Sequence, residues 1–436
     1  MNINFLFCNM QKTGLSQSVF EFNRKRFVQQ LKPNSIAVFN SNDIYPISAD
    51  STHPFEQHRD IFYLTGIDQE ETTLILYPDA ENPAHREIVF VRKTNPQIAV
   101  WEGHKLTAKE ATMVSGIKTV YWADTFEQVF MDLARHSEHI YINTNEHYRA
   151  KVETETREDR FIKWCKELFP YQKYEKSNFI LQRLRSVKAP EEIAQIKHAC
   201  SITEKGFRRV LGFVKPGVWE YEIQAEYAHE FLRNRSKGFA YTPIIASGSN
   251  SNVLHYIENN QQCQDGELLL MDVGAEFGNY ASDMTRTIPV SGRFSARQRA
   301  VYNAVLNVKN EATKLLVPGT LWKAYHKEVG KLMSSALIDL ELITKKDVLT
   351  NSEAYKTYFM HGTSHHLGLD THDYGLLDEP MQPNMVFTVE PGIYIPKEGF
   401  GIRLEDDVVV QASGAPINLM ANIPIDPDEI EGLMNG

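Results

Sequence analysis

The chain has 436 residues, which is long enough for two domains with large cores, and its formal net charge of −10 argues against a nucleic-acid-binding surface, which is expected to be basic. Its four cysteines are too widely spaced for a zinc knuckle or a redox pair, so we expect free thiols in a reducing compartment. Because no apolar run approaches membrane-spanning length and residues 1–7 do not resemble a signal peptide, we expect a cytoplasmic protein without a membrane partner.

The first part of the chain alternates helix and strand signals. An amphipathic segment over residues 19–31 is followed by strand-like runs at 35–39, 61–64, 73–77, 88–91 and 140–142. This alternation predicts an α/β domain of modest size. The charged and aromatic stretch that follows lacks a clean period, so we place the boundary there, with a first domain at 1–175 and a second at 176–436.

The second part of the chain opens with strong helix signals. Pro190 is expected at the first position of a long helix, and a second helix is predicted over residues 221–234. Ser295 with Gln298 forms a capping-box pattern, and Thr320 can cap the helix after that one. Between and after these helices the sequence favours β-hairpins, so we predict an α+β architecture with an antiparallel sheet.

Two aspartates flank a short turn in "MDVGAEFGNYASDM", residues 271–284. A two-residue turn at Phe277 and Gly278 makes Asp272 and Asp283 cross-strand partners, with Cβ atoms about 5 Å apart. Two like charges at that separation are destabilising unless one carboxylate is protonated or a cation lies between them. A single acidic pair is more often a solvated turn or a cap than a metal site.

A second acidic pair occurs in "VEPGIYIPKEGFGIRLEDD", residues 389–407. A turn centred on Lys397 and Glu398 places Glu390 opposite Glu405, although the loop length can shift this register. Two hairpins with opposed carboxylates favour a cation site more strongly than one does.

Histidines cluster in "HGTSHHLGLDTHD", at positions His361, His365, His366 and His372. A lone histidine is usually a core residue bonded to a backbone carbonyl, but imidazole combined with carboxylates is typical of a hydrolytic metal centre. Four carboxylates with one histidine favour a hard or borderline divalent ion such as Mn²⁺, and two ions would use this negative charge best.

These motifs resemble those of the pita-bread metallopeptidases, and among them the aminopeptidase P branch, which acts on X-Pro peptides. The resemblance extends over nearly the whole chain, because "RSVKAPEEI", "NVLHYIENN", "FTVEPGIY" and "DPDEIEGLM" are similar to segments of the catalytic domain, and "THPFEQHRDIFYLTGI" and "VWEGHKL" to segments of the N-terminal domain. It implies an α/β N-terminal domain and an α+β pita-bread catalytic domain with a curved antiparallel sheet.

The resemblance also implies a metal-binding set with two ions, usually manganese. Asp283 and Glu405 would bridge the ions, and the other ligands would complete their shells. The five ligands are Asp272, Asp283, His365, Glu390 and Glu405.

Further residues match the family's catalytic and substrate-binding positions. By resemblance, Glu390 acts as base and then acid, while His255 and His372 hydrogen-bond the substrate carbonyl and the tetrahedral intermediate. His361, Tyr394 and Arg403 would line the proline pocket, where hydrophobic packing is the alternative for Tyr394 and a surface ion pair for Arg403. His366 is expected as a variable residue at the pocket rim.

The activity implied by the resemblance is removal of the first residue from peptides with proline second, by attack of a metal-bridging hydroxide. A homodimer or homotetramer is implied as well. The alternatives are a prolidase that cleaves only X-Pro dipeptides, a metal-independent creatinase-like enzyme, a non-catalytic pita-bread binding module and an unrelated calcium-binding protein.

Overall fold

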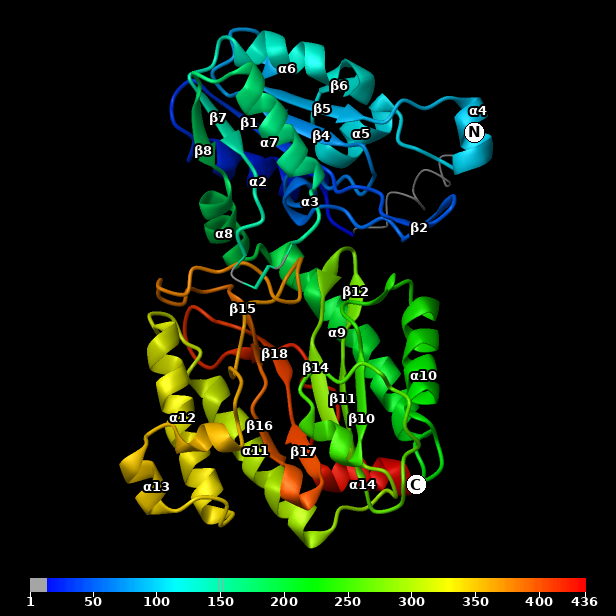
Figure 1. Ribbon diagram of the computed structural model, residues 1–436, viewed down its shortest axis with the longest axis vertical. Helices are drawn as coiled ribbons and strands as arrows, with labels where there is room; N and C mark the ends of the chain where they lie inside the picture. Colours follow the sequence, from blue (N-terminus) through cyan, green and yellow to red (C-terminus); the bar gives the residue numbers. More distant parts are fainter. Residues whose placement is uncertain (1–13, 148, 151) are drawn as a thin grey trace. The chain divides into compact units, whose positions relative to one another are not determined.

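The computed structural model describes residues 14–147, 149–150 and 152–436, and the chain forms two compact units, Met1–Arg185 and Ser186–Gly436 (Figure 1). The division falls later in the chain than the expected 175/176 border, because the end of helix α8 (Asn178–Ser186) is tied to the first unit. The Tyr63 hydroxyl donates a hydrogen bond to the carbonyl of Leu184 at 3.3 Å, and Arg185 pairs with Asp60 at 2.8 Å in a buried contact. These contacts draw the connecting helix into the first unit.

A six-stranded mixed sheet forms the centre of the first unit, in the order β6-β5-β4-β1-β7-β8. The strands at 35–39, 73–77, 88–91 and 140–142 are confirmed. β1 pairs antiparallel with β4, and β4 with β5, whereas the outer pairings are parallel. The strand bounds are β1 Ser35–Asn40, β4 Thr73–Leu76, β5 Glu87–Val91, β6 Thr119–Trp122, β7 His139–Ile142 and β8 Lys173–Lys176, with a small hairpin of β2 Pro46–Ser48 and β3 Ser51–Thr52.

Helices cover both faces of this sheet. One face packs on α6 (Phe126–Ala134) and α7 (Arg157–Leu168) through a core that includes Ile36, Phe130 and Phe161. Strand residues of the opposite parity contact the other helices, as Phe39 does with Phe27 at a ring separation of 5.3 Å. The remaining helices are α2 Gln17–Val28, α3 Arg59–Thr65, α4 Pro96–Glu102 and α5 Ala108–Ser115.

The strand expected at residues 61–64 is wrong, because these residues lie in helix α3. The helix begins after His58, whose side chain accepts a hydrogen bond from the backbone N–H of Asp60, and it ends at Gly66 with φ of 70°. All four residues of the run are buried, so their uninterrupted apolar pattern reflects a helix enclosed on every side.

The helices expected in the second unit are confirmed. Pro190 is the first residue of α9, and Ser295 and Gln298 form a complete capping box at the start of α11. Thr320 does not cap the next helix, since Leu321 occupies that position and the Thr320 hydroxyl donates to the carbonyl of Leu315 at 3.1 Å. The bounds are α9 Pro190–Leu211, α10 Glu220–Arg233, α11 Ala296–Lys314, α12 Trp322–Asp339, α13 Lys345–Thr350 and α14 Pro427–Asn435.

Antiparallel strands lie between these helices, with α9 and α10 beside one half and α11 and α12 beside the other (Figure 1). Each strand pairing in this unit is antiparallel, as the hairpin pattern predicts. The bounds are β9 Gly238–Phe239, β10 Ile244–Ser247, β11 Leu268–Val273, β12 Ala275–Phe277, β13 Tyr280–Ala281, β14 Met284–Pro289, β15 Val386–Val389, β16 Gly392–Ile395, β17 Phe400–Arg403, β18 Asp406–Val409 and β19 Ile417–Asn418.

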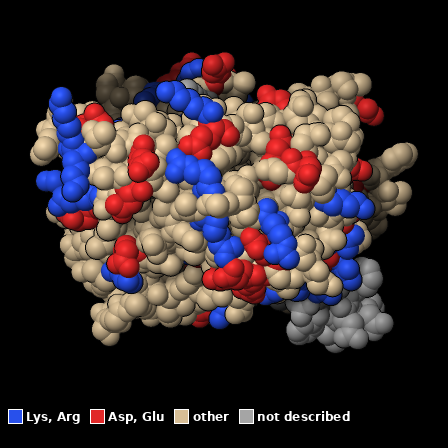
Figure 2. Space-filling model, turned by 90° about the horizontal axis from the view of Figure 1, so that it is seen from below, with Lys and Arg blue, Asp and Glu red and all other residues tan. Residues whose placement is uncertain are grey.

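Charged side chains of both signs are interspersed on the face seen from below in Figure 2. Ion pairs in the second unit include that of Arg297 with Glu398 at 2.7 Å. Within the described residues, no helix is long and apolar enough to cross a membrane. Cys165, Cys200 and Cys263 are buried free thiols, as expected, while Cys8 and the N-terminal residues 1–7 lie outside the described part of the chain.

Candidate metal centre

The first acidic hairpin forms, but its predicted register is wrong. Asp272 lies opposite Thr285 rather than opposite Asp283. The turn is made by Gly278 and Asn279, with φ of 59° and 68°, which is the left-handed pair that a two-residue hairpin turn requires. Asp283 therefore falls in the short interruption between β13 and β14.

Asp272 and Asp283 nevertheless converge on one side chain. The Tyr241 hydroxyl lies 2.6 Å from Asp272 Oδ1 and 2.5 Å from Asp283 Oδ1. The two chain segments approach closely at Gly274, where an added Cβ would lie 1.7 Å from the carbonyl oxygen of Ser282. A residue without a side chain is therefore required where the hairpin brings its two aspartates together.

The register of the second acidic hairpin is confirmed. Gly392 pairs with Arg403 in the β16–β17 ladder, and Val389 pairs with Asp406 in the β15–β18 ladder. Glu390 and Glu405 lie in the break between these two ladders, so the predicted turn at Lys397 and Glu398 places both carboxylates at the same level of the sheet.

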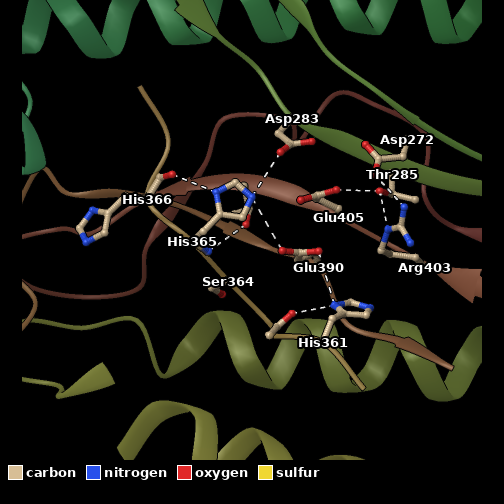
Figure 3. A network of polar contacts seen from close by, with 12 residues as sticks. Asp272, Asp283, Thr285, His361, Ser364, His365, His366, Glu390, Arg403 and Glu405 are labelled. Atoms are coloured by element: carbon tan, nitrogen blue, oxygen red, sulfur yellow. Dashed lines mark hydrogen bonds and ion pairs between the residues drawn. The ribbon is translucent and has the colours of Figure 1, made fainter. Parts of the chain in front are cut away.

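His365 joins the two hairpins at the centre of the cluster (Figure 3). Ligand atoms of Asp283, His365 and Glu405 all lie within 4.8 Å of one another. The Nε2 atom of His365 is 3.4 Å from Asp283 and 3.8 Å from Glu390. Its Nδ1 lies 2.9 Å from the carbonyl oxygen of His366, which favours a proton on Nδ1 and leaves Nε2 free to act as a ligand.

The carboxylates of this cluster carry more negative charge than the surrounding side chains compensate. Burial and mutual repulsion raise the pKa of Asp272, raise that of Glu390 to about 7, and raise that of Glu405 well above its usual range. For His365, burial lowers the pKa, but the hydrogen bond to Asp283 and the charge of Glu390 outweigh it and raise the pKa. A group of buried oxygen ligands with one imidazole fits a divalent cation.

A directed chain of hydrogen bonds lies beside the carboxylates. Arg403 donates to the Tyr394 hydroxyl at 2.8 Å, which lies 2.7 Å from His361 Nε2, and His361 Nδ1 lies 2.8 Å from the carbonyl of Gly362. Burial lowers the pKa of His361 to about 3, so its ring is neutral. Its Nε2 can then accept a hydrogen bond from the Tyr394 hydroxyl. Arg403 also pairs with Asp272 at 2.7 Å and is buried, which rules out the surface ion pair.

The remaining predicted histidines differ in their surroundings. The ring centroid of His372 lies 4.3 Å from that of His365, and His255 is close enough to His361 to lower the pKa of that ring further. His366 is not at a pocket rim. It is 5% exposed, with its ring 4.5 Å from Phe387 and stacked on Trp322 at 6.2 Å.

Several residues that position the cluster were not identified from the sequence. Besides Tyr241, Thr285 donates to Glu405 at 2.6 Å, and Asp407 accepts from the backbone N–H of Asp283 at 3.0 Å. These side chains act on ligands far away in the chain, so no local spacing reveals them.

A cavity of about 930 Å³ adjoins the hydrogen-bonded chain. It is lined by α12 and by residues 348–362, and it reaches His361 and Gly362. His361 is thus shared between the hydrogen-bonded chain and the cavity.

A buried set of carboxylates and one histidine, held on antiparallel hairpins, defines a metal-dependent hydrolase. The model of Metallopeptidase family M24 matches residues 194–412, and that of the Aminopeptidase P N-terminal domain matches residues 20–141. The chain belongs to metallopeptidase family M24.

Relatives match this chain over nearly their full length. The chain is 33% identical to the Xaa-Pro aminopeptidase of Haemophilus influenzae over 97% of this chain and 98% of that protein. It is 33% identical to the Xaa-Pro aminopeptidase of Escherichia coli over 96% and 98%. Among solved structures, a zinc-substituted E. coli aminopeptidase P in complex with product has a TM-score of 0.88 and 32% identity, covering 97% of this chain and 98% of that chain.

Proposed function

We propose that this protein removes the N-terminal residue from peptides whose second residue is proline. The observation that carries this proposal is the carboxylate–histidine cluster, which contacts His361 and Arg403 (Figure 3). These two side chains are in turn linked through Tyr394. Its relatives of matching length are named Xaa-Pro aminopeptidases, which supports the same activity here.

A divalent metal follows from the family and from the donor set. We propose two ions, most readily Mn²⁺, which Asp283 and Glu405 would help to hold together with the other ligands. A solved structure of the E. coli relative is zinc-substituted, so a different ion can enter that protein. When bound, the ions supply Lewis acidity and lower the pKa of water. The proposed ligands are Asp272, Asp283, His365, Glu390 and Glu405.

The protein's own groups would then move the protons and orient the peptide. The Glu390 carboxylate accepts a proton from the attacking water and delivers it to the departing proline nitrogen. His255 and His372 donate hydrogen bonds to the oxygen on which negative charge develops. Asp272 faces the free amine of the first residue, which restricts cleavage to the first bond.

Proline would be recognised by shape. Its nitrogen in a peptide bond has no hydrogen to donate, so the pocket must fit the ring. The bond from Tyr394 fixes the orientation of His361, and Arg403 holds Tyr394 in turn. These three side chains form a preorganised wall against which the ring can pack.

The cavity beside His361 favours an aminopeptidase over a prolidase, because it offers space for residues beyond the proline. The test compares an X-Pro dipeptide with a longer X-Pro peptide after chelation and again after addition of Mn²⁺. We expect chelated protein to be inactive and Mn²⁺ to restore cleavage, with the longer peptide preferred. Cleavage of the dipeptide alone would identify a prolidase, and no metal-dependent cleavage of either would overturn the proposal.

We also propose a homodimer or homotetramer in the cytoplasm, with peptides rather than nucleic acid or membranes as partners. On α4, Val100 is 79% exposed and Trp101 is 89% exposed, an apolar pair that a second copy would cover. The buried free thiols favour a reducing compartment. Light scattering of the purified chain measures its assembly, and a monomer at micromolar concentration would contradict this part of the proposal.

A further inference from the structure

His255 lies in a turn formed by residues 254 and 255, directly before the buried Tyr256. Val253, His255 and Ile257 are exposed, whereas Tyr256 is buried against Ile244 and its neighbours. Consecutive residues share a peptide unit, so the buried anchor at Tyr256 restricts the backbone position from which the His255 side chain projects.

One buried carboxylate holds this segment from both ends. Glu220, the first residue of α10, accepts hydrogen bonds from the backbone N–H and the hydroxyl of Ser247, both at 2.7 Å. Its other oxygen accepts from the Tyr256 hydroxyl at 2.8 Å and from the backbone N–H of Gln261 at 2.9 Å. The same side chain thus anchors the beginning, the middle and the end of the segment from 247 to 261.

The environment of Glu220 requires two acceptor oxygens, since each carboxylate oxygen receives at least two hydrogen bonds. The residue is 0% exposed, and within the described chain it has no ion pair with a basic side chain. The donors around it and its place at a helix N-terminus compensate its charge. A neutral amide has only one acceptor oxygen and cannot satisfy the same set of donors.

The opposite side of the segment is held by the sheet that carries Arg403. The backbone N–H of Gly401, in β17, donates to the Ser251 hydroxyl at 2.7 Å. An added Cβ at Gly401 would lie 2.5 Å from the carbonyl oxygen of Ser251, so the two backbones are in direct contact. The segment is therefore fixed between α10 and β17. The backbone position of His255 then depends mainly on the anchor at the neighbouring Tyr256.

We propose that Glu220 is a positioning residue for His255, which it directs toward the substrate through Tyr256. This inference rests on the proposed function, in which His255 donates a hydrogen bond to the developing oxyanion. Glu220 itself contacts neither substrate nor metal. Its effect on the reaction is therefore expected to exist only while the His255 imidazole is present.

The test combines Glu220→Gln with His255→Ala, using a long X-Pro peptide and Mn²⁺-loaded protein. We expect Glu220→Gln to lower kcat about tenfold with KM nearly unchanged, since a small displacement of a catalytic group is enough for such a loss. In the His255→Ala background the same substitution should cause no further loss. Amide exchange over residues 253–257 should become faster in Glu220→Gln.

Glu222→Gln is the matched control, because Glu222 is an exposed acid in the same helical turn and its capping bond to Trp219 tolerates an amide. Tyr256→Phe removes one hydrogen bond and leaves Glu220 in place, so it replaces Glu220→Gln if that variant does not fold. An equal loss of kcat with and without His255, or no loss in either variant, overturns the inference. Absence of X-Pro cleavage by the unmodified protein instead overturns the proposed function.

Discussion

Glu405 and Asp406 are consecutive buried acids on one chain segment, yet their surroundings are opposite. Asp406 pairs with Arg286 at 2.6 Å and contacts Lys309, and these cations hold its pKa below the usual range although burial alone would raise it. Glu405 faces Asp283 and Thr285, and its pKa is raised well above the usual range by burial and the neighbouring carboxylates.

The difference separates a structural acid from one that we propose as a metal ligand. Successive side chains of an extended chain point to opposite faces, so one acid meets the basic side chains of β14 and α11 while the other meets the carboxylate cluster. Arg286 and Lys309 compensate the charge of Asp406 from within the protein. For Glu405 we propose a cation taken up from solution.

The largest effect is expected on activity when Glu405 is substituted. Glu405→Gln should lower kcat/KM on an X-Pro peptide by about a thousandfold or more, because a proposed metal ligand is lost. The metal-free variant should be at least as stable as the unmodified protein, because a neutral amide avoids the repulsion that Glu405 meets from the neighbouring carboxylates. Full activity in this variant or in Asp283→Ala would refute the two-ion proposal.

Removing a cation that pairs with Asp406 should mainly affect stability. Arg286→Met leaves Asp406 with Lys309 and a hydrogen bond from Asn418, and it should reduce the free energy of unfolding by about 3–5 kcal/mol, because a buried charge loses one of its paired cations. Chemical denaturation of metal-free protein measures this loss. An Arg286→Met variant no less stable than Glu405→Gln would remove the distinction between the two acids.

Addition of Mn²⁺ should further distinguish the variant at Glu405 from the variant that affects Asp406. At about a hundredfold excess over its dissociation constant, Mn²⁺ should stabilise the unmodified protein by about 2.7 kcal/mol per site. Thermal unfolding with and without Mn²⁺ should show this shift in Arg286→Met as well, and a much smaller one in Glu405→Gln. Equal shifts in all three proteins would place the ion elsewhere.

The smallest effect concerns a partly buried histidine that lines the cavity beside α12. Burial lowers the pKa of His326, on α12, to about 4. Because the unfolded chain binds a proton below about pH 6.5 and the folded one does not, stability should fall as the pH drops from 6.5 toward 4. His326→Phe should remove about 1–2 kcal/mol of this acid sensitivity, measured by denaturation at pH 7 and pH 5. An unchanged difference between the two pH values would argue that His326 is already charged in the folded state.

The sequence was most informative where chemistry and turn geometry are local. Glu390 and Glu405 were paired correctly because a turn centred on Lys397 and Glu398 suffices to set their register. The other hairpin was misread because both Gly278 and Asn279 adopt left-handed conformations, which moves the turn and shifts the partner of Asp272 to Thr285. The five proposed ligands were identified by resemblance, and their roles stay predictions.

The distant side chains that bind or neutralise these acids could not be predicted in the same way. Nothing near Tyr241 indicates that its hydroxyl lies between two aspartates, and nothing near Arg286 indicates that it neutralises Asp406. Such partners are set by how distant strands pack, and single-chain periodicity carries no information about that. The helix at 61–64 was missed for a related reason, because complete burial removes the amphipathic pattern by which helices are recognised.

The close approach at Gly274 has a consequence for anyone who would transplant this site into another scaffold. Copying the acids and the histidine would not reproduce it, because the crossing of two backbones depends on a position that contributes no functional group at all. Gly274 therefore belongs to the minimal set of residues needed to rebuild the site, together with the side chains that would hold the ions.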